Sequence, residues 1–163
     1  MLPTDLTVSA VVERDGKFLI VEERASGVLV FTQPGGHIES AESPEEACTR
    51  EVLEEAACDV ALNSLLGVYL WIHPQSRQQF LRIVYVADLL QEHTDRKLDD
   101  GIHAVHWFSQ SDIKDRARRL RTPAVIRCID DYVAGHRQPE SILEGAIPIQ
   151  QRVADVLASA SLV

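Results

Sequence analysis

The sequence lacks long hydrophobic runs. None of its uninterrupted apolar stretches approaches the ~20 residues that a membrane-spanning helix needs, so we expect no membrane segment. The N-terminus, Met1-Leu2-Pro3-Thr4-Asp5, also lacks the basic start and the apolar stretch of a secretory signal. These absences predict a cytoplasmic protein without a membrane partner.

Cysteine is scarce. The three cysteines, Cys48, Cys58 and Cys128, are odd in number, and no two of them have the C-x-x-C spacing of a zinc site. We therefore expect reduced, mostly buried thiols in place of a disulfide or zinc framework.

Basic charge is also in deficit. The sequence contains 16 Lys and Arg residues against 25 Asp and Glu residues, which gives a formal net charge of −9 at pH 7. Such a charge argues against nucleic acid as the main partner. A small phosphorylated substrate stays compatible with it, because a bound cation can reverse the local sign of a site.

The 163 residues contain no repeat, low-complexity tract or flexible linker, which predicts one domain. Turn signals such as Asp15-Gly16 and Pro34-Gly35-Gly36 separate segments rich in apolar and β-branched residues. We expect strands over 6–13, 17–23, 28–31, 64–73, 80–90 and 102–108. We expect helices over 44–56 and 122–134, and a short helix that begins near residue 109. Strands that come first and then alternate with helices predict an α/β domain with a mixed sheet.

The helix expected over 44–56 has a strong start signal. Ser43 suits the N-cap, Pro44 the first helical position, and Glu46 completes a capping box. Apolar residues recur every four positions along one side and predict the face that packs on the sheet: Cys48, Val52 and Ala56.

Three carboxylates share another face of this helix. At 100° per residue, Glu54 lies about 60° behind Glu51, and Glu55 about 40° ahead of it. Like charges at this spacing repel one another, and a bound cation would offset that cost. Oxygen ligands suit Mg²⁺ or Mn²⁺ better than Zn²⁺. A solvated helix face is the simpler interpretation of the Glu-Glu pair alone, and Arg50 can pair with Glu46 or Glu54, each four residues away.

The spacing of one set of residues resembles the Nudix box of a hydrolase family: Gly36, Glu42, Arg50-Glu51 and Glu54-Glu55. Similarity to the bacterial NudJ-type phosphatases of that family extends to about residue 143, through residues 33–39, 81–82, 102–109, 120–123 and 135–137. The resemblance implies a Nudix fold, an α/β/α sandwich around a mixed β-sheet, over residues 1–143. The tail, 144–163, has helical spacing and is expected to pack on this domain, with packing on a second subunit as the alternative, so both a monomer and a homodimer are compatible.

The resemblance implies Mg²⁺ as cofactor, with Mn²⁺ as a possible substitute. Glu51, Glu54 and Glu55 would be ligands, together with the Gly36 carbonyl. Glu39 and Glu42 lie in the adjoining loop, where they could hold the helix or a second cation. Arg50 is expected to orient the carboxylates.

Three further residues are candidates for substrate binding. Arg82 lies in an otherwise apolar strand, where a cation is costly unless it is paired or faces a cleft. A phosphate contact and a structural ion pair are equally good interpretations. Trp71 could stack on a ring or pack in the core. The resemblance adds Gln33.

Other polar residues have simpler interpretations. His37 is expected to be an exposed loop histidine, and Asp99-Asp100 a solvated turn, although some relatives have a catalytic acid near there. The basic residues of 114–121 are expected to form a solvated face. Ala57 stands where the family usually has glycine, which leaves the closure of the helix end open.

The resemblance implies metal-dependent hydrolysis of phosphoanhydrides. Water would attack phosphorus, and Glu54, Glu55 or a residue outside the box would accept its proton. NudJ-type relatives release inorganic phosphate from nucleoside di- and triphosphates and from hydroxymethylpyrimidine and thiamine pyrophosphates, which are the substrates we expect. The alternatives are an ADP-ribose or nucleoside-diphosphate-sugar pyrophosphatase and, with less support, a nucleotide-binding module without turnover.

Overall fold

The computed structural model describes residues 4–139 of the chain. The strands are β1 (Thr4–Arg14), β2 (Lys17–Ala25), β3 (Val28–Thr32), β4 (Cys58–Ile72), β5 (Gln79–Glu92) and β6 (Ile102–Ser109). The helices are α1 (Pro44–Ala56), α2 (Gln110–Asp115) and α3 (Ala124–Val133), with a short 3₁₀ helix at Ala117–Arg119. Each element expected from the sequence is present.

One predicted boundary is wrong. β4 begins at Cys58 and not at residue 64. Its pairing with β5 shifts register between Asp59 and Val60 and again between Leu62 and Ser64. Each bulge breaks the alternation of inward and outward side chains, so the sequence pattern did not reveal the first part of the strand.

The strands form a mixed sheet, as predicted. β1 and β5 run parallel, from the Thr4–Gln79 pair to the Val12–Ala87 pair, and the other paired strands are antiparallel. The strand order is β3-β2-β1-β5-β4, and β6 pairs with β2.

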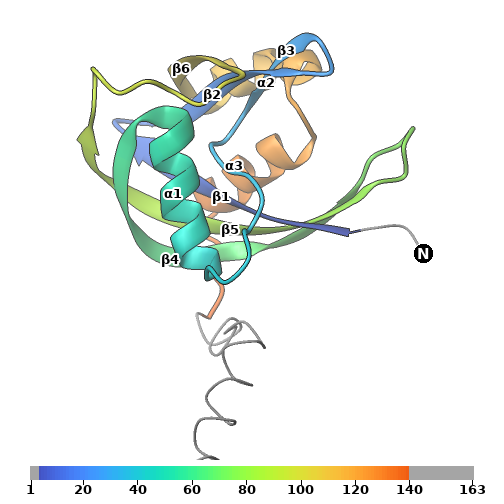
Figure 1. The fold of residues 1–163 in the computed structure, drawn as a ribbon, viewed down its shortest axis with the longest axis horizontal. Coiled ribbons are helices and arrows are strands. Elements are labelled where there is room, and N and C mark those ends of the chain that lie inside the picture. The colour runs from blue at the N-terminus through green and yellow to red at the C-terminus, as the bar shows by residue number, and fades with distance from the viewer. Residues whose placement is uncertain (1–3, 140–163) are drawn as a thin grey trace, which may run out of the picture.

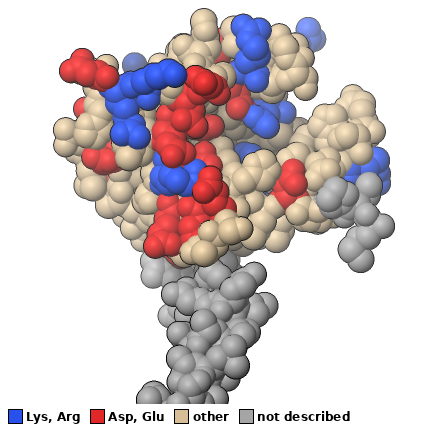
Figure 2. Space-filling view, in the orientation of Figure 1, with Lys and Arg blue, Asp and Glu red and all other residues tan. Residues whose placement is uncertain are grey.

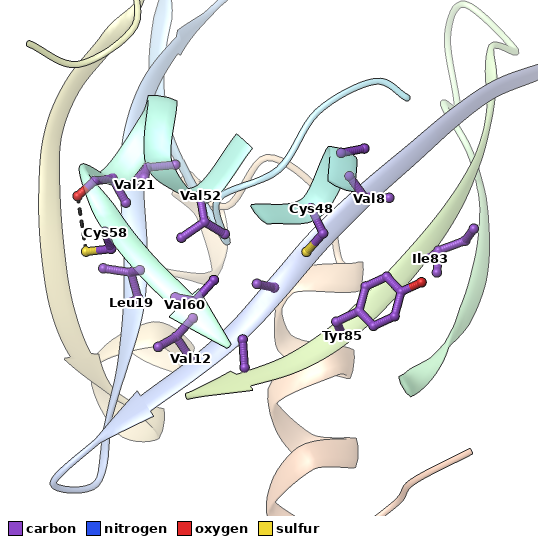
Figure 3. Packing of buried hydrophobic residues seen from close by; sticks show 14 of the residues in the cluster. Val8, Val12, Leu19, Val21, Cys48, Val52, Cys58, Val60, Ile83 and Tyr85 are labelled. Atoms are coloured by element: carbon purple, nitrogen blue, oxygen red, sulfur yellow. Dashed lines mark hydrogen bonds between the residues drawn. The ribbon is translucent and has the colours of Figure 1, made fainter. Parts of the chain in front are cut away.

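Helices cover both faces of the strands (Figure 1). On one face, Cys48 and Val52 of α1 pack with strand residues such as Leu19 and Tyr85 (Figure 3). On the other face, residues of α2 and α3 pack in a second cluster, which includes Val125. The expected α/β/α sandwich is therefore confirmed.

Several smaller predictions can be compared with this fold. The three residues expected on the packing face of α1 are all buried, and the three cysteines are free and buried. Over residues 4–139, no helix has the length and apolar character needed to cross a membrane. The tail expected over 144–163 lies outside the described residues.

Candidate active site

The start of α1 is held by the predicted capping box. The Ser43 hydroxyl accepts a hydrogen bond from the Glu46 N–H at 3.2 Å, and the Glu46 carboxylate accepts one from the Ser43 N–H at 2.8 Å. Both bonds satisfy N–H groups that the first turn of a helix leaves without partners. The box thus sets where α1 begins, and with it the positions of the three carboxylates.

The end of α1 adopts the left-handed conformation. Ala57 is the C-cap residue with φ 52° and ψ 39°, and its N–H donates to the Leu53 carbonyl at 3.1 Å. Helices commonly close this way, usually with glycine at the left-handed position. The helix therefore closes in a standard geometry, although an alanine occupies that position.

Arg50 joins α1 to the preceding loop. Its guanidinium donates two hydrogen bonds to Glu42, at 3.0 and 2.6 Å, and single bonds to Glu51 at 2.9 Å and Glu54 at 3.0 Å. Hydrogen bonds to Glu42 are the main reason that the pKa of Arg50 is raised. Of the two partners considered from the sequence, Arg50 pairs with Glu54, whereas Glu46 serves the capping box. Figure 2 shows basic atoms within a band of acidic side chains over α1.

Glu55 and Glu51 face the loop that precedes α1. The Glu55 carboxylate accepts a hydrogen bond from the Gly35 N–H at 2.8 Å, and burial raises its pKa to about 8. Burial also raises the pKa of Glu51. A Cβ on Gly36 would lie 2.5 Å from a Glu51 carboxylate oxygen, so a larger residue there would displace the Glu51 carboxylate. The Gly36 carbonyl accepts a hydrogen bond from the Val8 N–H at 2.9 Å.

These groups border a cavity of about 380 Å³. Its acidic wall includes Glu39, Glu51 and Glu55, beside Gly35 and Gly36. Glu23 adds a further carboxylate. The remaining residues around the cavity are basic, aromatic or small: Thr7, His37, Tyr69, Trp71, Phe80, Arg82, Arg121, Thr122 and Ala124. The cavity therefore brings carboxylates, guanidinium groups and aromatic rings together in one space.

Arg82 is half-buried in the wall of this cavity. Its Nε donates to the Thr7 hydroxyl at 3.4 Å, and no carboxylate of the described residues forms an ion pair with it. Burial lowers its pKa, because the charged form loses hydration without a close counterion. Of the two interpretations offered from the sequence, the ion pair is absent in residues 4–139.

Trp71 also lies at the cavity and outside the two core clusters. Its ring is half-buried, and its centroid lies 5.4 Å from that of Phe80. The two rings form an aromatic surface on the β4–β5 hairpin, which suits stacking on a flat group.

Gln33 lies elsewhere. It is 2% exposed, does not line the cavity, and donates from its side-chain amide to the Val125 carbonyl at 3.0 Å. This bond ties the end of β3 to α3. The bond gives Gln33 a structural role, and the substrate-binding role that the resemblance implied for it stays a prediction.

The two acidic residues of the loop before α1 have different positions. Glu42 holds the helix through Arg50, whereas Glu39 is exposed and lines the cavity. Asp99 is also exposed, but its N–H donates to the Glu54 carbonyl at 3.0 Å, which places this turn beside α1. His37 is exposed, as expected, and lies 3.5 Å from Asp5.

The basic residues of 114–121 form mainly surface ion pairs, as expected. Lys114 pairs with Asp130 at 2.9 Å and Arg119 with Glu22 at 2.6 Å. Arg121 differs, since it pairs with Glu23 at the cavity wall. Sequence reasoning missed the positions of Arg121 and Glu23, which are almost a hundred residues apart in the chain.

The carboxylates of α1 form the candidate metal site. Within the described part of the chain, no three acidic, histidine or cysteine side chains are arranged so that they could hold an ion together. The Arg50 guanidinium bonds two of the carboxylates, Glu51 and Glu54. The donor set is nonetheless all oxygen, and Glu55 is a half-buried acid that forms no ion pair with a basic side chain of the described residues. Its chemistry fits a hard divalent cation.

Comparison with known proteins identifies the family. The sequence matches the NUDIX domain over residues 3–127. The chain belongs to the Nudix family. Phosphatase NudJ of Escherichia coli strain K12 is 34% identical over 139 residues, which cover 85% of this chain and 90% of that protein.

Solved structures agree with this assignment. A NUDIX hydrolase from Nitrosomonas europaea is 41% identical, with a TM-score of 0.84 over 86% of this chain and 96% of the other. An ADP-ribose pyrophosphatase from Streptococcus suis has a TM-score of 0.62 over 82% of this chain and 96% of that one, but at 20% identity it shows the fold alone. This Nudix protein is thus a hydrolase of the pyrophosphate bonds of small phosphorylated molecules, as the sequence predicted, and its family generally uses divalent metal ions.

Proposed function

We propose that this Nudix hydrolase uses Mg²⁺ to cleave phosphoanhydride bonds in nucleoside di- and triphosphates and in related small pyrophosphates, with release of inorganic phosphate. Hydroxymethylpyrimidine and thiamine pyrophosphates belong to this class. The main support is the cavity itself, which Glu51 and Glu55 line together with Arg82, whose guanidinium forms no ion pair within residues 4–139. The negative charge of a polyphosphate complements the Arg82 guanidinium, and the cation that the polyphosphate carries complements the carboxylates.

Glu51, Glu54, Glu55 and the Gly36 carbonyl would hold the ion, and Glu39 lies where a second cation could bind. When bound, Mg²⁺ neutralises phosphate charge and lowers the pKa of a coordinated water. Mn²⁺ has similar ligand preferences and would substitute for it.

The protein supplies orientation and charge. Arg50 fixes Glu51 and Glu54 relative to the loop, so that both carboxylates face the same region. Arg82 would bind phosphate oxygens, and Trp71 would stack on the base or heterocycle of the substrate. Glu54 or Glu55 would accept a proton from the attacking water. The pKa of Glu55 is about 8 without a metal ion, and a bound cation would lower it and so favour the carboxylate form.

The experiment is a turnover assay on a panel of pyrophosphates with each product identified. The panel contains nucleoside di- and triphosphates, thiamine pyrophosphate, hydroxymethylpyrimidine pyrophosphate and ADP-ribose, each with Mg²⁺, Mn²⁺ or EDTA. We expect phosphate release that requires the metal and falls by orders of magnitude in Glu54→Gln and Glu55→Gln, with Glu45→Gln as the control at another position of α1. Mononucleotide release from ADP-ribose would favour the sugar-nucleotide alternative, and full activity in both variants would refute the site.

The cytoplasmic location, the choice between monomer and homodimer, and the domain boundary at residue 143 stay predictions of the sequence.

A further inference from the structure

The start of α3 forms part of the cavity wall. Arg121, Thr122 and Ala124 line it together with Arg82. α3 spans ten residues, and its N-cap, Pro123, makes no side-chain capping bond. The first turn of a helix carries N–H groups without intrahelical partners and a partial positive charge, so it attracts anions.

Thr122 gives a second, independent indication of a ligand. The residue is 7% exposed, and its hydroxyl has no hydrogen-bond partner among the described residues. A threonine just before a helix can cap it, but this one does not. Burial of an unpaired hydroxyl is unfavourable, which is consistent with a partner that is supplied by the substrate.

Two guanidinium groups line the cavity beside the start of α3. Arg82 has no ion-pair partner within residues 4–139, and Arg121 is close enough that its charge adds to burial in lowering the pKa of Arg82. Arg121 is held by Glu23 at the end of β2. Two carboxylates, Glu23 and Glu55, also act on Arg82, so what the two guanidinium groups offer an anion is hydrogen-bond donors and not an excess of positive charge. Figure 2 shows basic atoms directly beside the acidic band.

We propose that Thr122, Arg121 and the first turn of α3, together with Arg82, form a subsite for the terminal phosphate of the substrate. The identity of that substrate rests on the proposed function. A terminal phosphate has one more unbridged oxygen and more negative charge than each phosphate inside ADP-ribose. A site with a hydroxyl, two guanidinium groups and helix N–H donors therefore favours substrates that end in phosphate, and inorganic phosphate is the product that it would hold.

The test measures binding of inorganic phosphate to the full chain by thermal unfolding. Phosphate is titrated against chloride at matched ionic strength, with EDTA present so that no metal ion can hold the phosphate. The variants are Thr122→Val, which keeps the side-chain shape, and Arg121→Lys, which keeps the charge. Thr32→Val is the matched control, because Thr32 is 3% exposed and also has an unpaired hydroxyl in the described part of the chain, but does not line the cavity.

We expect phosphate to raise the Tm of the parent protein more than chloride does. The phosphate concentration for half of this rise should increase about tenfold in Thr122→Val and Arg121→Lys, as expected for a lost hydrogen bond to a charged group. It should not change in Thr32→Val. The proposal is refuted if phosphate has no specific effect on the parent, or if all three variants respond as the parent does.

The proposed function can fail separately. Phosphate binding needs no turnover, so an inert protein that still shows the Thr122 effect would refute the proposed function and keep the subsite. A protein that releases phosphate from pyrophosphates normally but shows no Thr122 effect would refute the subsite and leave the proposed function standing.

Discussion

At Ala57, a single methyl group opposes the backbone conformation that ends α1. An L-residue in the left-handed region with φ 52° is disfavoured by about 1 kcal/mol or more because its Cβ crowds the backbone. The neighbouring Ala56 has the helical conformation and nearly the same exposure, 5% against 6%. The two alanines thus differ mainly in backbone conformation.

We expect Ala57→Gly to be less destabilising than Ala56→Gly by about 1–2 kcal/mol in the free energy of unfolding. Each substitution removes one buried methyl and adds the same freedom to the unfolded chain, so the difference isolates the left-handed conformation. Urea unfolding of both variants measures it. Equal losses would show that Ala57 is not strained.

The three buried cysteines have thiol pKa values that burial has raised. Burial raises the pKa of Cys48 and of Cys128 to about 12 and that of Cys58 to about 11. Thiols with such values carry almost no thiolate at neutral pH, which agrees with packing roles.

Among the elements, α1 and its preceding loop form one unit. The capping box sets the first turn, the left-handed residue ends the last one, and Arg50 ties the middle to the loop through Glu42. The same Arg50 offsets repulsion among the acids in the absence of a metal ion. The unit is therefore assembled before a cation binds, which reduces the ordering that binding requires.

Arg50→Lys tests this unit. Lysine keeps the charge but lacks the planar fork that bonds three carboxylates. We expect a loss of about 1–3 kcal/mol in stability, and a lower kcat as Glu51 and Glu54 lose their orientation. Arg77→Lys, in the exposed β4–β5 turn, is the matched control. Unchanged stability and kcat in Arg50→Lys would show that the fork is dispensable.

Across the whole molecule, contacts between distant elements hold the layers around the cavity. Asp131 of α3 accepts a hydrogen bond from the Tyr69 hydroxyl of β4 at 3.0 Å and bonds Arg127 at 2.8 Å. Burial favours the protonated form of Asp131, but the bonds from Arg127 and Tyr69 outweigh it and lower its pKa below 3.8.

This lowered pKa predicts how stability depends on pH. Asp131 binds a proton less readily in the folded chain than in the unfolded one, so its contribution is full above about pH 4 and is lost as pH falls through the folded pKa. We expect the free energy of unfolding of Asp131→Asn to be about 1 kcal/mol lower than that of the parent at pH 7. This difference should disappear below about pH 4. Unfolding between pH 3 and 7 measures it, with the exposed Asp95→Asn as control. A gap that does not depend on pH would contradict the assignment.

Local patterns were sufficient to predict much of this protein. Ser43, Pro44 and Glu46 predicted where α1 begins, and residues spaced by four predicted the face that it buries. These features depend on neighbours within one or two helical turns, so they can be inferred from the sequence. The same spacing put Glu51, Glu54 and Glu55 on one face, and the family resemblance followed from it.

Only the tertiary structure decided which residues meet. Glu23 and Arg121 pair at the cavity wall, Arg82 lies there without a counterion in the described residues, and Gln33 is turned away towards α3. These relations depend on the register of β1 with β5 and on where α3 packs, since both join residues far apart in the chain. A one-residue change in register would move each strand side chain to the opposite face. Burial and charge at the cavity therefore arise from long-range packing, which local sequence patterns do not encode.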